Sequence, residues 1–376
     1  MTRPSITTSD TSRAKRKANR RMTTARPLIV ATYLLVALLV LIGCGSSAAT
    51  VTTSAQTTPI ANVTTPVSTV AAPARVTPSP AATSAATAMA TPDTSAATAT
   101  TSTSALPNFD HIYIIVMENK ESTAIIGSDR APYLNSLIGQ SGLATSYTGV
   151  SHPSLPNYLA LWSGSTHGIT DDNIHDLAGP TLADQLDAAG KSWSVFAENY
   201  PVAAAGATPT CFTKATSSGG EDGSGNYSRK HNPAMSFTSL SADPTRCSQH
   251  VTDFTHFDAA AVNFSFIVPN ACHDMHDCPV SEGDKWIQQW LPQHILNTPT
   301  WKNSNSAIFI TWDEGETAKD GGGNVPLIVI SHQTPAGFRS QMPFDHYSLL
   351  LTIERAWGLG CLSSACQATD LSAFFH

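Results

Sequence analysis

Continuous apolar runs with polar residues at both ends constrain the fold of this chain more than any other feature. The first is HIYIIVM at 111–117, which is rich in β-branched residues. An unbroken run of this length is typical of a strand that is buried on both faces of a parallel sheet. Similar runs lie at 192–197, 263–268 and 307–312, with a fifth candidate at 325–330. These runs predict a buried, mostly parallel sheet.

Helical patterns lie between the strand runs, at 131–140, 155–162, 181–189, 282–296 and 346–357. Alternation of strand and helix predicts an α/β fold, doubly wound, with helices on both faces of the sheet. Ligands of such folds bind beyond the carboxyl ends of the strands. Residues 199–260 break the pattern and are rich in Gly, Ser, Asn, Thr and Pro. They predict a long, disulfide-held insertion near the site.

The N-terminal residues 1–44 have the features of a signal peptide. Eight basic residues precede an uncharged apolar run at 28–42, which ends in Leu41-Ile42-Gly43-Cys44. The run is shorter than the roughly 20 residues that a permanent membrane span needs. Its end resembles a lipobox, in which Cys44 becomes the lipidated N-terminus. The alternative is an uncleaved signal anchor, and both interpretations place the rest of the chain outside the cytoplasm.

Residues 45–106 are almost entirely Ala, Thr, Ser, Pro and Val, with no aromatic residue, and only Arg75 and Asp93 are charged. This composition cannot supply a hydrophobic core, so the segment is predicted to be a disordered stalk, either O-glycosylated or unmodified. The folded domain is then 107–376. We expect a monomer held on the outer face of a bacterial cell membrane by the lipid on Cys44.

Charge and cysteine content narrow the function of the remaining chain. Without residues 1–44, 21 − 8 = 13 basic and 28 − 1 = 27 acidic residues remain, a net charge near −14, which argues against a nucleic-acid partner. The six other cysteines are an even number in an oxidising compartment and predict three disulfides. Fifteen connectivities exist, and short spacing favours Cys272–Cys278 and Cys361–Cys366, which leaves Cys211–Cys247.

Polar residues follow two of the predicted strands directly. Glu118 and Asn119 come after the first run, and Asp313 and Glu314 come after the run at 307–312. Three carboxylates and an amide at one edge of a sheet repel one another unless a cation lies between them. Oxygen ligands of this kind suit Mg²⁺, Ca²⁺ or Mn²⁺. The alternative is that these residues are solvated loop residues or helix caps.

The segment SHPSLPNYLALWSG at 151–164 contains a candidate nucleophile. Ser154 precedes a predicted helix, and Pro156 is favoured in a first helical turn. Backbone N–H groups at a helix N-terminus stabilise an anion, so a phosphate could bind there. The alternative is that Ser154 only caps the helix, and the two roles are compatible.

Seven segments between Asp110 and Leu359 together resemble a known family. They include HIYIIVMENK, SHPSLPNYLALWSGSTHGITDDN and IFITWDEGE. They are similar to the bacterial phosphoesterase family of acid phosphatases and phospholipases C, within the alkaline phosphatase superfamily. The resemblance implies that Ser154 is the nucleophile and that one divalent ion (Mg, Ca, Mn or Zn) is bound by Glu118, Asn119, Asp313 and Glu314.

Differences from other members of the superfamily narrow the chemistry further. The dizinc phosphodiesterases have Asp-Gly after the first strand and a His after the late Asp, where this chain has Glu118-Asn119 and Glu314. One metal ion is therefore expected. Sulfatases carry an Arg two residues after the proline of their nucleophile motif, and Tyr158 stands there instead. Hydrolysis of sulfate esters is disfavoured.

By the same resemblance, histidines surround the phosphate and one of them protonates the leaving oxygen near neutral pH. We expect His346 and His276 in catalytic roles, and His231, His273, Lys230 and Asn157 around the phosphate. Any one of these histidines could instead lie at the surface or behind the site. Asp274 and Asp277 could orient the rings. His152, His167 and Asp172 are expected to shape the loop near Ser154.

The sequence therefore predicts an extracytoplasmic, metal-dependent phosphomonoesterase that forms a phosphoserine at Ser154. Its substrate would be a small phosphate ester or a phospholipid. A phospholipase C or another phosphodiesterase on the same scaffold is one alternative, and a non-catalytic surface lipoprotein is another. A serine esterase is disfavoured because Gly164-Ser165-Thr166-His167 does not match the motif Gly-x-Ser-x-Gly. The glycines of Gly321–Asn324 are most simply a loop before a strand.

Overall fold

The strand runs form one eight-stranded sheet in the computed structural model, which describes residues 106–204, 210–217, 226–318 and 321–376. The strand order is β5-β4-β6-β1-β7-β8-β2-β9. The long strands are β1 (His111–Met117), β4 (Trp193–Ala197), β6 (Phe264–Val268), β7 (Ser306–Trp312) and β8 (Leu327–Ser331). The short ones are β2 (Gly142–Ala144), β5 (Val251–Thr252) and β9 (Arg339–Ser340). All five predicted strand runs are therefore present.

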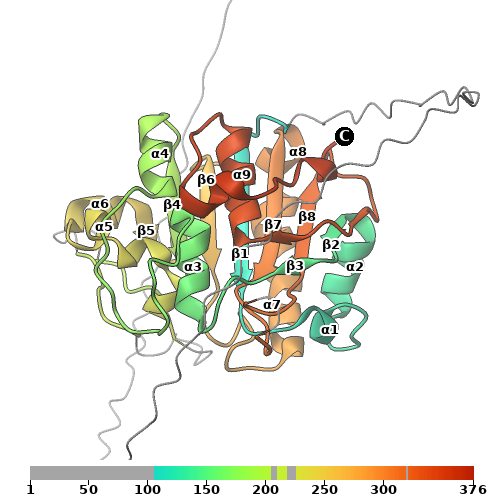
Figure 1. The fold of residues 1–376 in the computed structure, drawn as a ribbon, viewed down its shortest axis with the longest axis horizontal. Helices are drawn as coiled ribbons and strands as arrows, with labels where there is room; N and C mark the ends of the chain where they lie inside the picture. The colour runs from blue at the N-terminus through green and yellow to red at the C-terminus, as the bar shows by residue number, and fades with distance from the viewer. Residues whose placement is uncertain (1–105, 205–209, 218–225, 319–320) are drawn as a thin grey trace, which may run out of the picture. The chain divides into compact units, whose positions relative to one another are not determined.

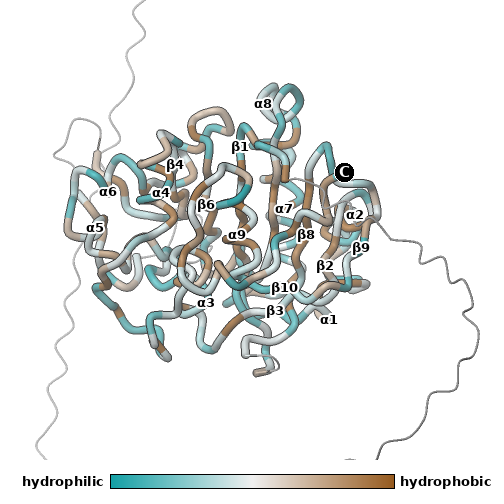
Figure 2. Tube along the Cα trace, turned by 45° about the horizontal axis from the view of Figure 1, so that its top comes forward, coloured by the Kyte–Doolittle hydropathy of each residue, from teal (hydrophilic) through white to brown (hydrophobic). Residues whose placement is uncertain are grey.

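The central strands run in one direction. β1 pairs in parallel with β6 on one side and with β7 on the other, and β4 is parallel to β6. β8 is antiparallel to both β7 and β2, so the sheet is mixed but mostly parallel, as predicted. Every residue of β6 and β7 is buried, which explains why the apolar runs show no alternation with polar residues. Figure 2 shows the same strands as hydrophobic segments inside more polar surroundings.

Helices occur where the sequence predicted them. They are α2 (Pro132–Gln140), α3 (Ser154–Ser163), α4 (Leu182–Ala188), α7 (Val280–Leu291, continued as a π-helix at Pro292–Leu296) and α9 (His346–Ala356). α3 packs against α4 and α9, whereas α2 packs against α7. Figure 1 shows α3, α4 and α9 in front of the sheet. The doubly wound α/β class is confirmed.

Local sequence signals account for several helix ends. Thr181 and Asp345 each close a capping box at the start of α4 and α9, which satisfies N–H groups of the first turn. Gly190 and Gly358, just beyond the ends of these two helices, have φ of 66° and 65°. Glycine adopts this left-handed conformation at little energetic cost, so it ends a helix well.

The segment between β4 and β6 contains short helices rather than a regular layer. These are α5 (Thr238–Ser241), α6 (Pro244–His250) and a 3₁₀ turn at Arg229–His231. A Cys211–Cys247 disulfide holds it, and Cys272–Cys278 and Cys361–Cys366 form the other two disulfides. The predicted pairing is confirmed. Buried Arg229 also donates to the Met235 carbonyl at 2.6 Å, which ties the 3₁₀ turn to the residues that follow it.

Three shorter elements complete the fold near the site. α1 (Ser122–Ile125) follows β1, α8 (Pro299–Asn303) precedes β7, and β3 (Tyr147–Thr148) pairs in parallel with β10 (Phe344–Asp345). Among the described residues, no helix is long and apolar enough to cross a membrane. The predicted signal peptide, Cys44 and the stalk lie outside the described residues, apart from the last residue of the stalk.

Candidate active site

The carboxyl ends of β1 and β7 bring the two predicted acidic pairs together. Met117 is opposite Trp312 in the sheet, so Glu118 and Asp313 leave neighbouring strands side by side. Both side chains are fully buried, and Glu314 is 5% exposed. Asn119 has φ of 51°, a conformation that Asn tolerates better than most residues, and its backbone N–H donates to Asp313 Oδ1 at 3.1 Å. The sharp turn after β1 therefore links the two pairs.

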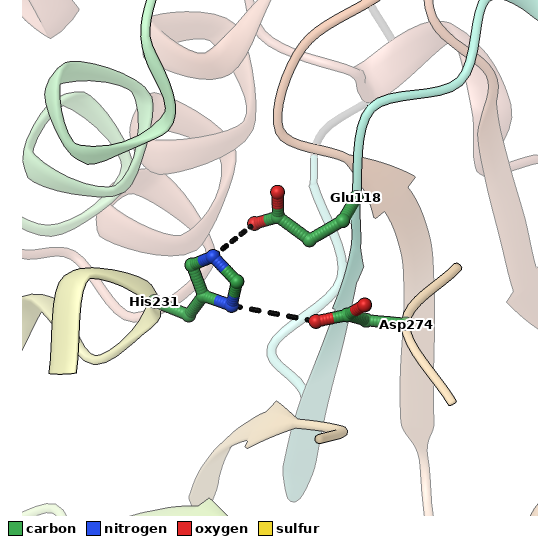
Figure 3. A group of neighbouring side chains, drawn as sticks. All are labelled: Glu118, His231 and Asp274. Carbon is green, nitrogen blue, oxygen red and sulfur yellow. Dashed lines mark ion pairs between the residues drawn. The ribbon is translucent and has the colours of Figure 1, made fainter. Parts of the chain in front are cut away.

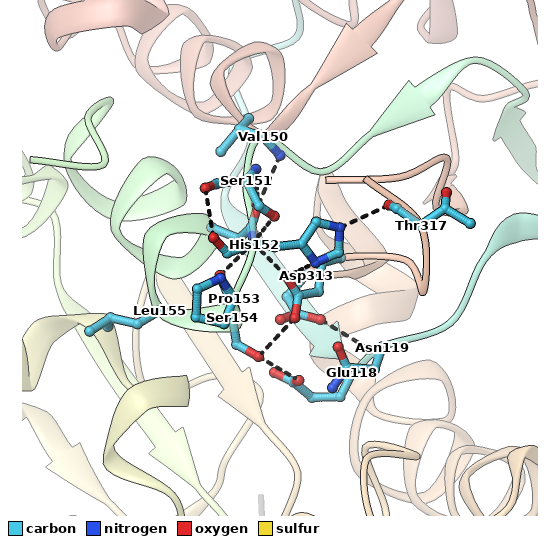
Figure 4. A network of polar contacts seen from close by, with 12 residues as sticks. Glu118, Asn119, Val150, Ser151, His152, Pro153, Ser154, Leu155, Asp313 and Thr317 are labelled. Carbon is cyan, nitrogen blue, oxygen red and sulfur yellow. Dashed lines mark hydrogen bonds and ion pairs between the residues drawn. The ribbon is translucent and has the colours of Figure 1, made fainter. Parts of the chain in front are cut away.

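Ser154 lies between these carboxylates at the first turn of α3 (Figure 4). It is 1% exposed, and its Oγ lies 3.3 Å from Glu118 Oε2 and 3.4 Å from Glu314 Oε1. The N-cap of α3 is Pro153, and Asp172 accepts a hydrogen bond from Leu155 N at 3.0 Å. The Ser154 hydroxyl thus faces the acidic pairs instead of capping its helix.

Lys230 supplies the positive charge nearest to Ser154. Its Nζ lies 3.4 Å from Ser154 Oγ and 2.9 Å from Asp172 Oδ2. Burial acts to lower the pKa of Lys230, but the hydrogen bond to Asp172 and the charge of Glu118 outweigh it, so the pKa is raised. Lys230 is therefore a fixed cation beside Ser154. It also lines a cavity of about 210 Å³, together with Leu155, Asp172 and Ile174.

A second buried group contains Glu118, His231 and Asp274 (Figure 3). His231 Nε2 lies 3.2 Å from Glu118 Oε1, and His231 Nδ1 lies 3.3 Å from Asp274 Oδ2. Tyr158 donates to Glu118 Oε1 at 2.5 Å, and its ring stacks on that of His231. Sequence reasoning assigned Asp274 only to orienting histidines. The two aspartates of the segment CHDMHD were the feature of the sequence that could have indicated a fourth carboxylate in the site.

Burial and mutual repulsion raise the pKa of every carboxyl group in this cluster. Burial is the main cause for Glu118 and Asp274, whose pKa values are raised well above the ordinary range, and Asp313 adds to both. Burial also raises the pKa of Asp313 to about 6, and burial with the charge of Asp313 raises that of Glu314 to about 8. The metal-free site therefore holds protons near neutral pH.

The donor atoms of the cluster fit a divalent cation. Within the part of the chain that the structure describes, buried Asp313 Oδ2 makes no hydrogen bond, and the ion-pair contacts of His231 Nε2 and Asp274 Oδ2, at 3.2 and 3.3 Å, lack hydrogen-bond geometry. Buried polar atoms that lack a good hydrogen bond are unfavourable, and a cation would satisfy the carboxylate oxygens. Carboxylate oxygens suit Mg²⁺, Ca²⁺ or Mn²⁺, and an added imidazole also suits Zn²⁺.

The predicted histidines occupy different positions. His346 is fully buried, with Nε2 donating to the Asp313 carbonyl at 2.5 Å and Nδ1 accepting from Tyr147 at 2.8 Å. Burial lowers its pKa to about 4. His276 lies beside His231, with its ring centroid 5.9 Å from that of His231, and its Nδ1 contacts Asp277. The structure thus groups His231 and His276, while His346 supports the Asp313 backbone.

Two predicted phosphate-binding residues make other contacts. His273 Nδ1 lies 2.8 Å from Glu198, and its ring stacks on Trp286. The Asn157 side chain accepts from Val150 N at 2.8 Å and donates to the Ser151 carbonyl at 2.9 Å. Asn157 therefore shapes the loop that carries Ser154, and His273 packs against residues outside the carboxylate cluster.

A buried serine lies among carboxyl groups that fit a cation, at the carboxyl edge of a doubly wound sheet, and these are the groups that an ester hydrolase needs. Residues 127–360 match the description "Phosphoesterase family", and the chain belongs to that family. It is a phosphoric ester hydrolase. The chain is 33% identical to a phosphatidylinositol-3-phosphatase of Mycobacterium tuberculosis, covering 71% of this chain and 84% of the relative. It is 28% identical to an acid phosphatase of Aspergillus fumigatus, covering 68% of this chain and 56% of the relative.

The solved structures that match this chain are distant in sequence. A phosphonate monoester hydrolase of Agrobacterium radiobacter is 12% identical, with a TM-score of 0.45 over 71% of this chain and 77% of that protein. A protein of the alkaline phosphatase superfamily from Vibrio parahaemolyticus is 9% identical, with a TM-score of 0.44 over 70% of this chain and 71% of that protein.

Proposed function

We propose that this protein is an extracytoplasmic, metal-dependent phosphomonoesterase that uses Ser154 as its nucleophile. The observation that carries this proposal is the position of buried Ser154 Oγ, which lies within 3.4 Å of Glu118, Glu314 and Lys230. Acid phosphatases among the relatives support the choice of a monoester. The three disulfides support a location outside the cytoplasm.

Glu118, Asp313 and Glu314 would hold the cation, with Asn119 as the fourth ligand expected from the sequence. Asp274 and His231 extend the donor set on the other side of Glu118. The bound cation would supply positive charge to the phosphate oxygens and to the Ser154 oxygen. Lys230 would bind a further phosphate oxygen, because its ammonium group lies beside Ser154 and is charged at neutral pH.

In the proposed reaction, Ser154 Oγ forms a bond to phosphorus while the bond to the leaving oxygen breaks. The Ser154 proton passes to one of the carboxylates 3.3–3.4 Å away. We assign protonation of the leaving oxygen to His276, because both ring nitrogens of His346 are bound by Tyr147 and the Asp313 backbone. Water then cleaves the phosphoserine and releases phosphate.

Replacing the nucleophile tests the proposal directly. Ser154→Ala should keep the free energy of unfolding within about 1 kcal/mol, because the hydroxyl makes only long contacts in the fold. Turnover of p-nitrophenyl phosphate should fall by roughly 10³-fold or more, since the covalent route is lost. Mass spectrometry of acid-quenched wild-type enzyme should find phosphate on the peptide that contains Ser154.

Ser151→Ala and Ser165→Ala are the matched controls, since both serines are near Ser154 in sequence but are not placed among the carboxylates. They should keep most of the activity. If Ser154→Ala remains active while Ser151→Ala is inactive, the nucleophile is misassigned. If all three remain active, the enzyme uses direct attack by water.

A substrate panel separates the proposal from its alternative. A phosphomonoesterase should hydrolyse p-nitrophenyl phosphate and phosphoinositide monoesters in preference to bis-p-nitrophenyl phosphate and phosphatidylcholine. The opposite preference would identify a phosphodiesterase or phospholipase C on this scaffold.

A further inference from the structure

Two loops meet beside the site. The acidic loop follows β7 and has the described residues 313–318 and 321–324, and the second loop, 149–153, leads to Ser154. They are joined by contacts that the proposed reaction does not use. The His152 side chain lies between them (Figure 4). Its Nδ1 is 2.7 Å from Glu314 Oε2, and its Nε2 is 2.8 Å from the Thr317 carbonyl oxygen. A carbonyl oxygen only accepts hydrogen bonds, so Nε2 must carry a proton and Nδ1 faces the carboxylate. The ring therefore links Glu314 to the backbone of its own loop.

Thr317 is fixed in turn by Glu121, the residue just before α1. Glu121 Oε1 accepts from Thr317 N at 3.0 Å and from Thr317 Oγ1 at 2.6 Å. The same carboxylate lies so close to Gly315 and Gly323 that a Cβ at either position would be 2.4 or 2.7 Å from its oxygen. Glu121 thus packs closely against the acidic loop. At Gly323, where φ is 78° and a Cβ would also lie 2.8 Å from the Thr317 carbonyl oxygen, only glycine fits without strain.

The glycines at 321–323, which the sequence analysis left as a simple loop, complete this arrangement. Gly149 N donates to the Gly323 carbonyl at 3.1 Å. A Cβ on Gly322 would lie 2.5 Å from the carbonyl carbon of Gly149, so the two backbones are in direct contact. The acidic loop is therefore held at both ends, by Glu121 and by the loop that carries Ser154.

The two oxygens of Glu314 consequently have separate partners. Oε2 faces His152 Nδ1 at 2.7 Å and Asn157 Nδ2 at 3.4 Å, whereas Oε1 faces Ser154 Oγ at 3.4 Å. Without the imidazole, the carboxylate could rotate about its side-chain bonds and exchange these roles. Outer partners of this kind orient metal-binding carboxylates, and their loss typically lowers cation affinity or activity by about 10- to 100-fold.

We propose that His152 is a positioning residue that sets Glu314 Oε1 toward Ser154 and the bound cation, within a clamp that Glu121 closes through Thr317. This inference rests on the proposed function. His152 touches neither the nucleophile nor the phosphate in this role. It acts through Glu314. The contact of Nδ1 with Glu314 and the contact of Nε2 with the Thr317 carbonyl can therefore be removed one at a time and their effects compared.

Two substitutions separate those contacts. His152→Asn places an amide near the position of Nδ1, so it keeps a donor for Glu314 and loses the link to Thr317. His152→Gln places its amide near the position of Nε2, so it keeps the Thr317 contact and loses Glu314. His152→Ala removes both. The matched control is His256→Ala, because His256 Nδ1 also contacts a carboxylate, Asp253 at 2.7 Å, but takes no part in the site.

The experiment makes two measurements on the full chain. The first is the calorimetric affinity of the metal-stripped protein for Mg²⁺, Ca²⁺, Mn²⁺ and Zn²⁺, without substrate. The second is kcat and KM with p-nitrophenyl phosphate. His152→Ala and His152→Gln should bind the preferred cation about 10- to 100-fold more weakly and lose kcat by a similar factor, with KM changed less than about threefold. His152→Asn and His256→Ala should stay within about fivefold of wild type in both quantities. Thr317→Val, which removes one bond to Glu121, should lower affinity in the same direction by a smaller factor.

The inference is overturned if His152→Ala binds the cation and turns over substrate like wild type. It is equally overturned if His152→Gln is active and His152→Asn is not, because the role would then depend on Thr317 and not on Glu314. If His152→Ala does not fold, the Asn and Gln pair decides the question. A wild-type protein that hydrolyses no phosphate ester fails in the second measurement, which rejects the proposed function before any variant is compared.

Discussion

Four buried carboxyl groups within one pocket are the dominant feature at the scale of single residues. Glu118, Asp274, Asp313 and Glu314 are each no more than 5% exposed, and all have raised pKa values. Like charges in a buried site lower stability unless protons or a cation neutralise them. The same residues that make the site reactive therefore destabilise the metal-free protein, and cation binding should reverse this effect.

Removing one of these charges should change cation affinity and metal-free stability in opposite directions. Asp313→Asn keeps an oxygen for the Asn119 N–H but loses the charge. We expect cation affinity and kcat to fall by about 10-fold or more, while the metal-free protein unfolds at the same or a higher temperature. Calorimetry and thermal unfolding measure the two effects. Asp129→Asn, at an exposed carboxylate, is the control and should change neither.

The raised pKa values also predict how stability depends on pH. Glu314 has a pKa of about 8 in the folded protein, against an ordinary value of 4.5, so the folded state keeps a proton that the unfolded state has released. Stability from such a group is complete below pH 4.5 and is lost as pH rises toward 8. The buried histidines, whose pKa values are lowered, are neutral in the folded state, whereas in the unfolded state an imidazole with the ordinary pKa of 6.5 is half protonated at pH 6.5. They therefore offset a small part of the loss just above pH 6.5 and contribute little once the unfolded imidazoles are also neutral.

The melting temperature of metal-stripped protein should therefore fall by about 5 °C or more between pH 6.5 and 8.5. A saturating divalent cation should remove most of this dependence, because it replaces the protons. Buried Glu354, with its pKa raised to about 7, adds a cation-independent part, so the comparison is best made in Glu354→Gln protein. A metal-free melting temperature that does not change with pH would contradict the proposed electrostatics of the site.

At the scale of secondary-structure elements, the sequence was most informative where one residue pattern determines one structure. Unbroken apolar runs predicted the strands, and Gly190 and Gly358 marked helix ends correctly. Because β1 and β7 are parallel neighbours, the residues that follow them had to meet, so the two acidic pairs were predictable together. The antiparallel direction of β8 could not be predicted, because a buried strand has the same residue pattern in either direction.

The histidines show where such prediction ends. His346 and His276 both occupy polar segments between apolar ones, yet His346 is fully buried beneath Asp313 and His276 is partly exposed. The burial of His346 depends on Tyr147, which is 199 residues away in sequence, and the exposure of His276 depends on how the loop closed by Cys272–Cys278 packs on the rest of the domain. Burial of this kind is set by packing between elements, and no local pattern encodes it. The contact between His152 and Glu314 was missed for the same reason.

The two short disulfides offer a matched comparison between elements. Cys272–Cys278 and Cys361–Cys366 close loops of similar length, with sequence separations of 6 and 5, so removal of either should lower stability by roughly 2 kcal/mol. Only the first loop contains Asp274 and His276. Cys272→Ser with Cys278→Ser should therefore lower kcat by at least about 10-fold at a temperature where both variants stay folded.

Cys361→Ser with Cys366→Ser should lose stability but keep kcat within about threefold. Denaturant unfolding and steady-state kinetics on both variants provide the comparison. Equal loss of activity in the two would show that the Cys272–Cys278 loop has no special role in placing site residues.

At the scale of the whole molecule, the folded domain and the preceding segment carry different parts of the proposed function. Every residue assigned to the site lies between Glu118 and His346, within the described chain. The predicted anchor, Cys44, is separated from Glu118 by a long Ala-, Thr-, Ser- and Pro-rich segment that has no composition suited to a core. Catalysis should therefore be independent of anchoring, and anchoring should depend on one residue.

Cys44→Ser in the full chain tests that separation. Two acyl chains bind a protein stably to a membrane, so loss of the lipidated sulfur should move the phosphatase activity from the membrane fraction to the soluble or secreted fraction, or leave an unprocessed precursor. The kcat of the released protein should remain within about twofold of wild type, because no site residue is altered. Ser46→Ala is the control, and its protein should stay with the membrane.

Unchanged mass and unchanged membrane retention of the Cys44→Ser protein would exclude the lipoprotein interpretation and favour an uncleaved signal anchor. A large loss of kcat in the released protein would instead show that the membrane itself contributes to activity, which would point to a substrate presented in the lipid surface.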